Sequence, residues 1–326
     1  MNDSPLKNWV PYKLMKAGGQ MQCYWLNTYG ERFTEPFFEE TILRCRAMNS
    51  ERAAISSISD LMMIKEWAPE LDPVEPAAFI FHISRCGSTL ISQLLAMVNQ
   101  HIVLSEAPFF DDILRLSYKY PNFDQTETTE LLAAAIKYYG QKKIDQEVPN
   151  EGKGVHLFIK TDSWHLFFYK QLRQLYPSVP FILMYRRPDE VFSSQKKTPG
   201  MQAVPGLIEP QVFGFKPEEL VYDLDIHLAN VLERYLQQCF EITETDNNCL
   251  LLNYNEGTMQ MIKKISAFTN ISFSPDTLHT MEERSRYHSK RPDEQFSKKA
   301  LGVIPASLNK AMMLYDEFEK KRMGIH

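Results

Sequence analysis

From residue 77 onward, the chain alternates between short apolar runs and longer stretches whose apolar residues recur at helical spacing. The apolar runs are AFIFHI (78–83), HIVL (101–104), VHLFI (155–159), PFILMY (180–185) and CLLLN (249–253). Runs this short and continuous are typical of parallel strands that are buried on both faces. Helical patterns between them include 88–99 and 221–242. The alternation predicts a doubly wound α/β fold, a parallel sheet flanked by helices, with ligands at the carboxyl ends of the strands.

The first 75 residues have a different pattern. The aromatic segments YKLM and QCYWLN flank Gly18-Gly19 and predict a hairpin. The segment PFFEETILRCRAM that follows has apolar residues near helical spacing, at Phe38, Ile42, Leu43 and Met48. The proline-spaced WAPELDPVEP (67–76) is the expected linker. We therefore expect an N-terminal accessory segment (1–75) and an α/β domain (76–326).

Composition excludes several classes of protein. The 326 residues carry a formal net charge of −5, which disfavours general nucleic-acid binding. The start of the chain lacks the pattern of a secretory signal, and no stretch approaches the apolar length of a membrane span. Five scattered cysteines form no CxxC pair, and the eight histidines show no ligand spacing, so we expect neither disulfides nor a metal. The expectation is a cytoplasmic protein without a membrane or nucleic-acid partner.

A small polar loop follows the first apolar run and precedes a helical pattern. In Arg85-Cys86-Gly87-Ser88-Thr89, Gly87 permits close backbone approach, and amides at a helix start attract anions. A strand–turn–helix with Ser88 or Thr89 as N-cap remains an alternative interpretation. An ATP-type P-loop requires Gly where His82 stands and Lys where Ser88 stands, which disfavours a kinase or ATPase.

This loop resembles the 5′-phosphosulfate loop of sulfotransferases, which has a basic residue, a small residue, Gly and two hydroxyl residues. Cys86 stands where Ser is usual. A second stretch, FILMYRRPDEVFSSQ, resembles the 3′-phosphate motif of the same family, with Arg186 at a strand end, Pro188 two residues later and Ser194 eight later. The resemblance covers about residues 77–270 and implies a P-loop-like sulfotransferase architecture that binds 3′-phosphoadenosine-5′-phosphosulfate (PAPS).

The resemblance also implies catalytic residues. Lys160, at the end of VHLFIK, matches the lysine that contacts the transferring sulfuryl group or the bridging oxygen. Glu106 follows Arg85 at the offset of the general base in the tyrosylprotein branch, and it is our first choice for the base. Asp162, where the cytosolic small-molecule branch often has His, is the second. In the basic loop 285–296, Lys290 or Arg291 would help to cover the nucleotide phosphates, although a plain surface loop is the simpler interpretation.

The expected activity is sulfuryl transfer from PAPS to a hydroxyl, or less readily an amine, of a small-molecule or peptide acceptor, without a metal, releasing 3′-phosphoadenosine-5′-phosphate (PAP). The acceptor stays open. The segments 108–150 and 196–220 contain aromatic residues that could line an entrance or pack the core: Phe109, Phe110, Tyr118, Phe213 and Phe215. The first 75 residues could serve acceptor choice or a homodimer contact. Two alternatives remain, a P-loop phosphotransferase with a degenerate loop and a non-catalytic nucleotide-binding module.

Overall fold

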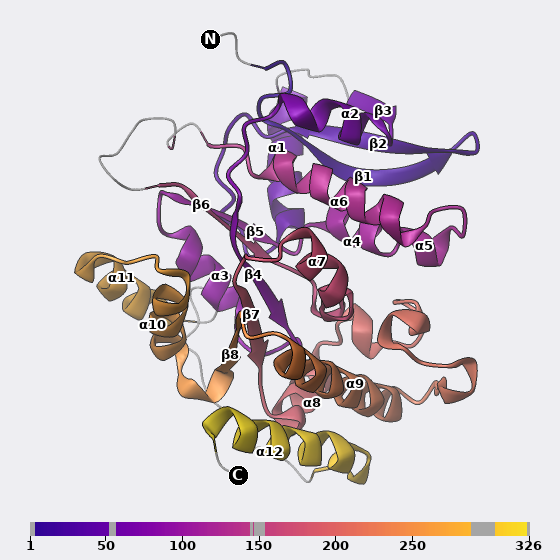
Figure 1. Ribbon diagram of the computed structural model, residues 1–326, viewed down its shortest axis with the longest axis vertical. Helices are drawn as coiled ribbons and strands as arrows, with labels where there is room; N and C mark the ends of the chain where they lie inside the picture. The colour runs from indigo at the N-terminus through magenta and orange to yellow at the C-terminus, as the bar shows by residue number, and fades with distance from the viewer. Residues whose placement is uncertain (1–3, 52–56, 144–145, 147–153, 288–303, 325–326) are drawn as a thin grey trace. The chain divides into compact units, whose positions relative to one another are not determined.

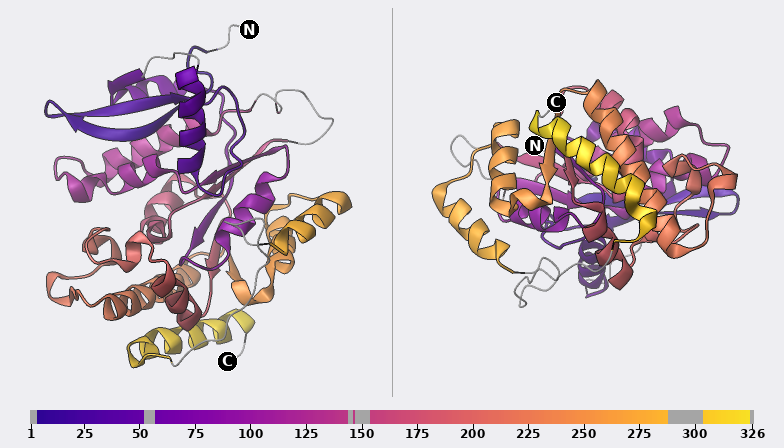
Figure 2. Two further views of the ribbon diagram at one scale, coloured as in Figure 1. Left: turned by 180° about the vertical axis from the view of Figure 1, so that it is seen from behind. Right: turned by 90° about the horizontal axis from the view of Figure 1, so that it is seen from below.

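The computed structural model describes residues 4–51, 57–143, 146, 154–287 and 304–324 (Figures 1 and 2). Within them lie a three-stranded antiparallel sheet, in the order β1-β2-β3, and a five-stranded sheet in the order β5-β6-β4-β7-β8. The latter is the parallel sheet that the sequence predicts, so the α/β class is confirmed. No helix in the described part of the chain combines the length and apolar character needed to cross a bilayer.

All five apolar runs are strands, with bounds within two residues of those expected. They are β4 (Pro76–His82), β5 (His101–Ser105), β6 (His156–Lys160), β7 (Phe181–Tyr185) and β8 (Cys249–Asn253). In the parallel register, Ser105 lies opposite Lys160, and Tyr185 lies opposite Asn253. The two strands of each pair, β5 with β6 and β7 with β8, therefore end at the same level, and the residues that follow them lie side by side.

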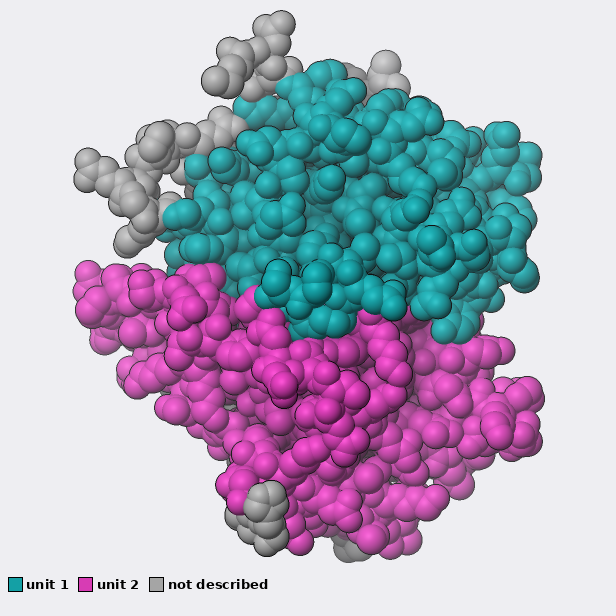
Figure 3. All heavy atoms as spheres, in the orientation of Figure 1, with its two compact units in different colours: residues 1–79, 89–161, 171–179 teal, residues 80–88, 162–170, 180–326 magenta. Residues whose placement is uncertain are grey.

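The chain divides into two compact units, coloured separately in Figure 3. Unit 1 comprises residues 1–79, 89–161 and 171–179, and unit 2 comprises residues 80–88, 162–170 and 180–326. Both units are discontinuous in sequence. The expected boundary between residues 75 and 76 stays a prediction.

In unit 1, β1 (Trp9–Ala17) and β2 (Gln20–Asn27) form a hairpin that turns at Gly18-Gly19, and β3 (Ser57–Asp60) pairs with β2. Helix α1 (Phe38–Glu51) follows the hairpin. The segment is the helix expected from its spacing, in which Phe38, Ile42 and Cys45 are buried while Leu43 is 61% exposed. Positions 38, 42 and 45 follow the helical period, whereas Leu43 falls beside that stripe.

Unit 1 contains further helices: α2 (Met63–Trp67), α4 (Pro108–Leu114), α5 (Leu116–Lys119) and α6 (Gln125–Tyr139). Of these, α4 and α6 contact β1 of the hairpin. Helix α7 (Tyr169–Leu175) is divided between the two units, because residues 162–170 belong to unit 2 and residues 171–179 to unit 1. The hydroxyl of Tyr139 donates to the carbonyl of Pro11, and Gln141 Nε2 donates to the carbonyl of Trp9 at 3.0 Å. These hydrogen bonds attach the hairpin to the last residue of α6 and to Gln141, which lies just beyond that helix.

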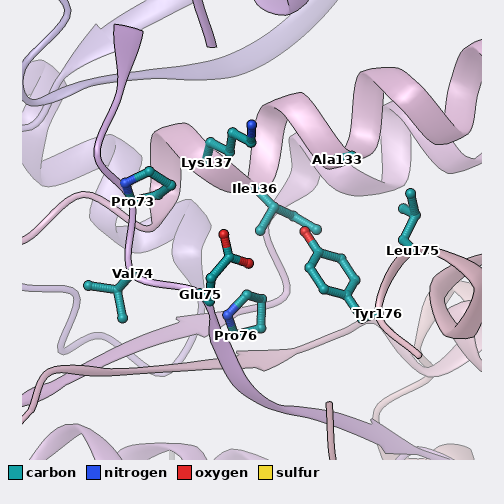
Figure 4. A pocket seen from close by; sticks show the side chains of 9 residues that line it. All are labelled: Pro73, Val74, Glu75, Pro76, Ala133, Ile136, Lys137, Leu175 and Tyr176. Atoms are coloured by element: carbon teal, nitrogen blue, oxygen red, sulfur yellow. The ribbon is translucent and has the colours of Figure 1, made fainter. Parts of the chain in front are cut away.

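A small pocket of about 180 Å³ lies between Pro73–Pro76, α6 and Tyr176. Figure 4 shows the side chains that line it.

Unit 2 holds β7, β8 and the C-terminal helices. These are α8 (Pro188–Lys197), α9 (Leu224–Thr245), α10 (Thr258–Thr269), α11 (Pro275–Ser285) and α12 (Asn309–Met323). Helices α9 and α12 pack through Phe240 and Phe318, whose ring centroids are 5.1 Å apart. Helix α3 (Ser88–Ala96) begins at the last residue of the loop after β4.

Candidate active site

The loop after β4 has an unusual backbone. Ser84, Arg85 and Gly87 all have positive φ angles, of 70°, 51° and 81°. Such a conformation in a non-glycine residue is uncommon and costs on the order of 1–3 kcal/mol, so neighbouring contacts must hold it. Ser84 N–H donates to His82 Nδ1 at 3.0 Å, and Gln195 Nε2 donates to Ser84 Oγ at 2.9 Å. Successive amides in a turn that includes left-handed residues form concave nests that bind anions.

Gly87 cannot be replaced without strain. Besides its positive φ, a Cβ at this position would lie 2.8 Å from Cδ2 of Tyr254, whose ring covers the loop. The neighbouring Cys86 is buried, and its Sγ donates to the carbonyl of Met184 at 3.4 Å. The thiol therefore faces β7, and only the backbone of Cys86 is available to line a nest. Ser88 is buried at the start of α3, and Thr89, the first residue of the next unit 1 segment, is half-buried.

Arg186 joins the second motif to this loop. It follows the last residue of β7, and its Nη1 donates to the carbonyl of Arg85 at 3.3 Å. Its Nε donates to Glu190 at 2.9 Å, and its guanidinium carbon lies 4.2 Å from the ring centroid of Tyr254. Burial raises the pKa of Tyr254, so the ring stays neutral beside the cation. The structure thus brings together two motifs that lie far apart in the sequence.

Helix α8 carries Ser194 and is contacted by the side chain of Arg85. Ser194 is half-buried on this helix, two turns beyond its start. The guanidinium of Arg85 donates to the carbonyl of Thr198, the residue that ends α8. The loop and α8 are therefore connected by side chains in both directions, since Gln195 of α8 binds Ser84. We call the set Arg85, Gly87, Arg186, Glu190 and Tyr254 the loop cluster; all its members belong to unit 2.

In unit 1, Glu106 and Lys160 form an ion pair. Lys160 ends β6, and Glu106 directly follows β5, so the parallel register places them together. The side chain of Lys160 is 0% exposed and that of Glu106 is 20% exposed. Glu106 N–H donates to the carbonyl of Lys160 at 2.8 Å, and Glu106 has a φ of 52°. The Nζ of Lys160 also lies 5.5 Å from the ring centroid of Phe37.

Asp162, the second choice for the base, lies in unit 2 beside His165. Its Oδ2 is 3.7 Å from His165 Nε2, and its N–H donates to His165 Nδ1 at 3.3 Å. Asp162 thereby starts the short 3-10 helix that runs from Ser163 to Phe168. Lys290 and Arg291 lie outside the described residues. The choice between Glu106 and Asp162 stays a prediction, with Glu106 the one that contacts the predicted catalytic lysine.

Sequence reasoning did not identify several residues that shape these sites. Glu190 carries a detectable signal, because an acid four residues after an arginine is a common pairing on a helix. Tyr254 lies in the stretch NYNEG, which resembles the strand–Tyr-Glu–helix segment of sulfotransferases. Nothing in this stretch predicts the contact of Tyr254 with Gly87. Gln195 and Phe37 have no sequence signal for their contacts, which arise from packing. Of the residues suggested for an entrance, Tyr118 is exposed and the four phenylalanines are buried.

Comparison with known proteins adds context. No family model and no curated protein matches the chain. Solved structures that resemble it include the sulfotransferase STF9 from Mycobacterium avium, with 12% identity, 80% of each chain covered and a TM-score of 0.48. A sulfotransferase domain from the curacin biosynthetic pathway has 14% identity over 76% of this chain and 99% of its own, with a TM-score of 0.49. These are distant likenesses, and an activity must be argued from the residues of this chain.

Proposed function

We propose that this protein transfers a sulfuryl group from PAPS to an acceptor hydroxyl. The observation that carries the proposal is the contact between Arg186 and the loop at Arg85, completed by the ring of Tyr254. These are the two stretches whose sequences resemble the phosphate-binding motifs of sulfotransferases. Their meeting in one cluster is what a ligand with two separate phosphate groups requires.

The arginines of the loop cluster, together with Ser88, Thr89 and Ser194 outside it, offer donors that fit such a ligand. Guanidinium groups, hydroxyls and amides at a helix start all donate hydrogen bonds, and charge-assisted bonds to phosphate are about twice as strong as neutral ones. Arg186 and Ser194 would hold the 3′-phosphate. Arg85, Ser88 and Thr89, with the loop amides, would hold the 5′-phosphosulfate. When bound, PAPS supplies a sulfur–oxygen bond whose leaving group is a phosphate.

Residues of the chain would then complete the reaction. The acceptor oxygen forms a new bond to sulfur while the bond from sulfur to the bridging phosphate oxygen breaks, and the electron pair leaves on the phosphate. Glu106 accepts the hydroxyl proton, a role typically worth about 10²–10⁴-fold in rate. By the roles that the resemblance implies, Lys160 and Arg85 would offset the charge that develops on the leaving phosphate, a contribution of about 3–4 kcal/mol for one well-placed donor. Lys160 also holds the Glu106 carboxylate in place.

The first test is titration calorimetry of the full chain with PAP and, separately, with ATP, both without a divalent cation. Micromolar binding of PAP with little binding of ATP is the expected result. The matched variants are Arg186→Ala and Arg187→Ala, because Arg187 is an adjacent arginine paired with Asp189 at 2.9 Å and outside the loop cluster. Loss of PAP binding in the first only would support the assignment.

Turnover with PAPS and a panel of phenols, alcohols and amines separates the alternatives. Sulfated product supports the proposal. Magnesium-dependent turnover of ATP would favour a phosphotransferase. Tight PAP binding without transfer to any acceptor would favour a non-catalytic nucleotide-binding module.

A further inference from the structure

Helix α12 contacts the carboxyl ends of two neighbouring strands in unit 2. Tyr185, the last residue of β7, is fully buried, and its ring packs against Tyr315 and Phe318 of α12, with centroids 6.1 Å and 4.9 Å apart. Asn253, the last residue of β8, donates from Nδ2 to the hydroxyl of Tyr315 at 2.7 Å. One helix therefore holds the ends of both strands.

A chain of polar contacts extends this attachment. The hydroxyl of Tyr185 donates to Glu319, which also accepts two hydrogen bonds of 2.9 Å from Arg322. Arg322 Nη1 donates to Glu256 at 3.1 Å, and Glu256 accepts from the N–H of Asn253 at 3.0 Å. The network thus runs from β7 through α12 to β8. Burial favours protonation of Glu319, but the hydrogen bonds from Arg322 and Tyr185 outweigh it and lower the pKa of that carboxyl.

The residues held in this way immediately precede two members of the loop cluster. Arg186 follows Tyr185, and Tyr254 follows Asn253. The guanidinium of Arg186 lies against the ring of Tyr254, and each also touches the loop after β4, at Arg85 and Gly87 respectively. A shift of either strand end would therefore move a side chain that we assign to the donor nucleotide.

Attachment of α12 alone does not require polar groups. Phe318 and Ala311 already bury apolar surface on its inner face, and apolar substitutes for buried ionic groups are often neutral or stabilising. Hydrogen bonds with fixed geometry, in contrast, allow only one position of the partners, and a fully satisfied network makes that position rigid. The contacts of Tyr315, Glu319 and Arg322 are of this directional kind.

We infer that Tyr315, Glu319 and Arg322 of α12 are positioning residues, which fix Arg186 and Tyr254 for the nucleotide through the ends of β7 and β8. The inference rests on the proposed function, since it assigns these residues to the same ligand. It assigns a role in donor binding to residues of α12, which lies outside the two motifs. None of the three touches the loop cluster directly in any contact described above.

The test compares PAP affinity, by calorimetry, with thermal stability in matched variants of the full chain. Tyr315→Phe removes one hydroxyl and keeps the ring, and Glu319→Gln weakens the contacts to Tyr185 and Arg322. Each should weaken PAP binding about tenfold, the equivalent of one directional contact. At saturating PAPS and acceptor, kcat should stay within about twofold while the KM for PAPS rises, because positioning acts on donor binding.

Two control variants separate positioning from mere stability. Phe240→Leu on α9 removes apolar packing against Phe318 of α12, whose ring centroid is 5.1 Å away, rather than a contact with a strand end. It should therefore lower the Tm at least as much as Tyr315→Phe but leave PAP affinity within about twofold. Lys321→Met removes the exposed contact of α12 with Glu244 on α9, of 3.4 Å, and should change neither quantity appreciably.

The outcomes are distinct. Wild-type binding of PAP, with Tyr315→Phe and Glu319→Gln unchanged, would overturn the inference and leave the proposed function standing. Equal loss of affinity in Phe240→Leu would likewise overturn it, because stability alone would then explain the effect. Absence of PAP binding in the wild-type protein would overturn the proposed function and this inference together.

Discussion

The loop cluster of unit 2 and the Glu106–Lys160 pair of unit 1 are built on different principles. In the loop cluster, the backbone is shaped by positive φ angles at Arg85 and Gly87, and Arg186 contacts a carbonyl, an aromatic ring and an acid. In the pair, two side chains of opposite charge bind each other, and one is fully buried. A site made by backbone amides should tolerate some change of side chain, as at Cys86, whose thiol faces the carbonyl of Met184. A pair of opposite charges should not, because each side chain binds the other.

The largest effect should come from the pair. Glu106→Gln keeps the size of the side chain but removes the proton acceptor, so kcat with PAPS should fall by about 10²–10⁴-fold. PAP affinity should remain within about twofold, as measured by calorimetry, because the loop cluster is untouched. Asp162→Asn is the matched comparison. Near-normal turnover in Glu106→Gln together with a large loss in Asp162→Asn would transfer the base role to Asp162.

The next largest effect should come from Arg186→Ala, which should weaken PAP binding by about 10–100-fold through loss of charge-assisted hydrogen bonds. The substitution also removes the ion pair of Arg186 with the buried carboxylate of Glu190. For this reason the double variant Arg186→Ala/Glu190→Gln should recover stability in chemical denaturation without recovering affinity. If the double variant regained tight PAP binding, the effect of Arg186 would be structural.

A backbone test sharpens the comparison further. Gly87→Ala should lower the free energy of unfolding by about 1–3 kcal/mol and weaken PAP binding, because both the positive φ and the Tyr254 ring oppose a Cβ. Gly206 is the control, since it has a φ of 82° but nothing within 4 Å of an added Cβ. Gly206→Ala should therefore be milder in urea denaturation and leave PAP binding unchanged. Equal losses of stability would show that the ring is not a constraint.

The smallest effect should come from Cys86→Ser. The thiol faces the carbonyl of Met184, away from any ligand that the loop amides would hold, so PAP affinity should change by less than about threefold. A serine hydroxyl can donate the same bond, and stability should change by about 1 kcal/mol or less. A tenfold change in affinity, measured by calorimetry, would show that this side chain takes part in binding.

Sequence alone predicted the parts of the molecule that depend on local pattern. The five strands were found because strands buried on both faces consist of short apolar runs, and their ends placed Lys160 and Arg186 correctly at strand termini. The pairing of Glu106 with Lys160 was not predicted, because it depends on β5 and β6 being neighbours in the sheet. The ring of Tyr254 against Gly87, and the contact of Gln195 with Ser84, depend on how distant segments pack, which no local pattern records. The spacing in residues 38–48 indicated a helix but not which apolar residues are buried, because a short run of apolar residues fits more than one helical stripe; Leu43 is exposed.

The discontinuity of the two units has a consequence for biosynthesis. A chain that emerges from the ribosome contains the loop after β4 early, but Arg186 and Tyr254 follow much later, and α12 comes near the end. Unit 1 in turn lacks its last segment until residue 179 has been made. Contacts between segments so far apart in the chain form slowly, since long loops must close first. The proposed nucleotide site would therefore form only after α12 has been made, and a nascent chain that lacks α12 would not bind the proposed donor.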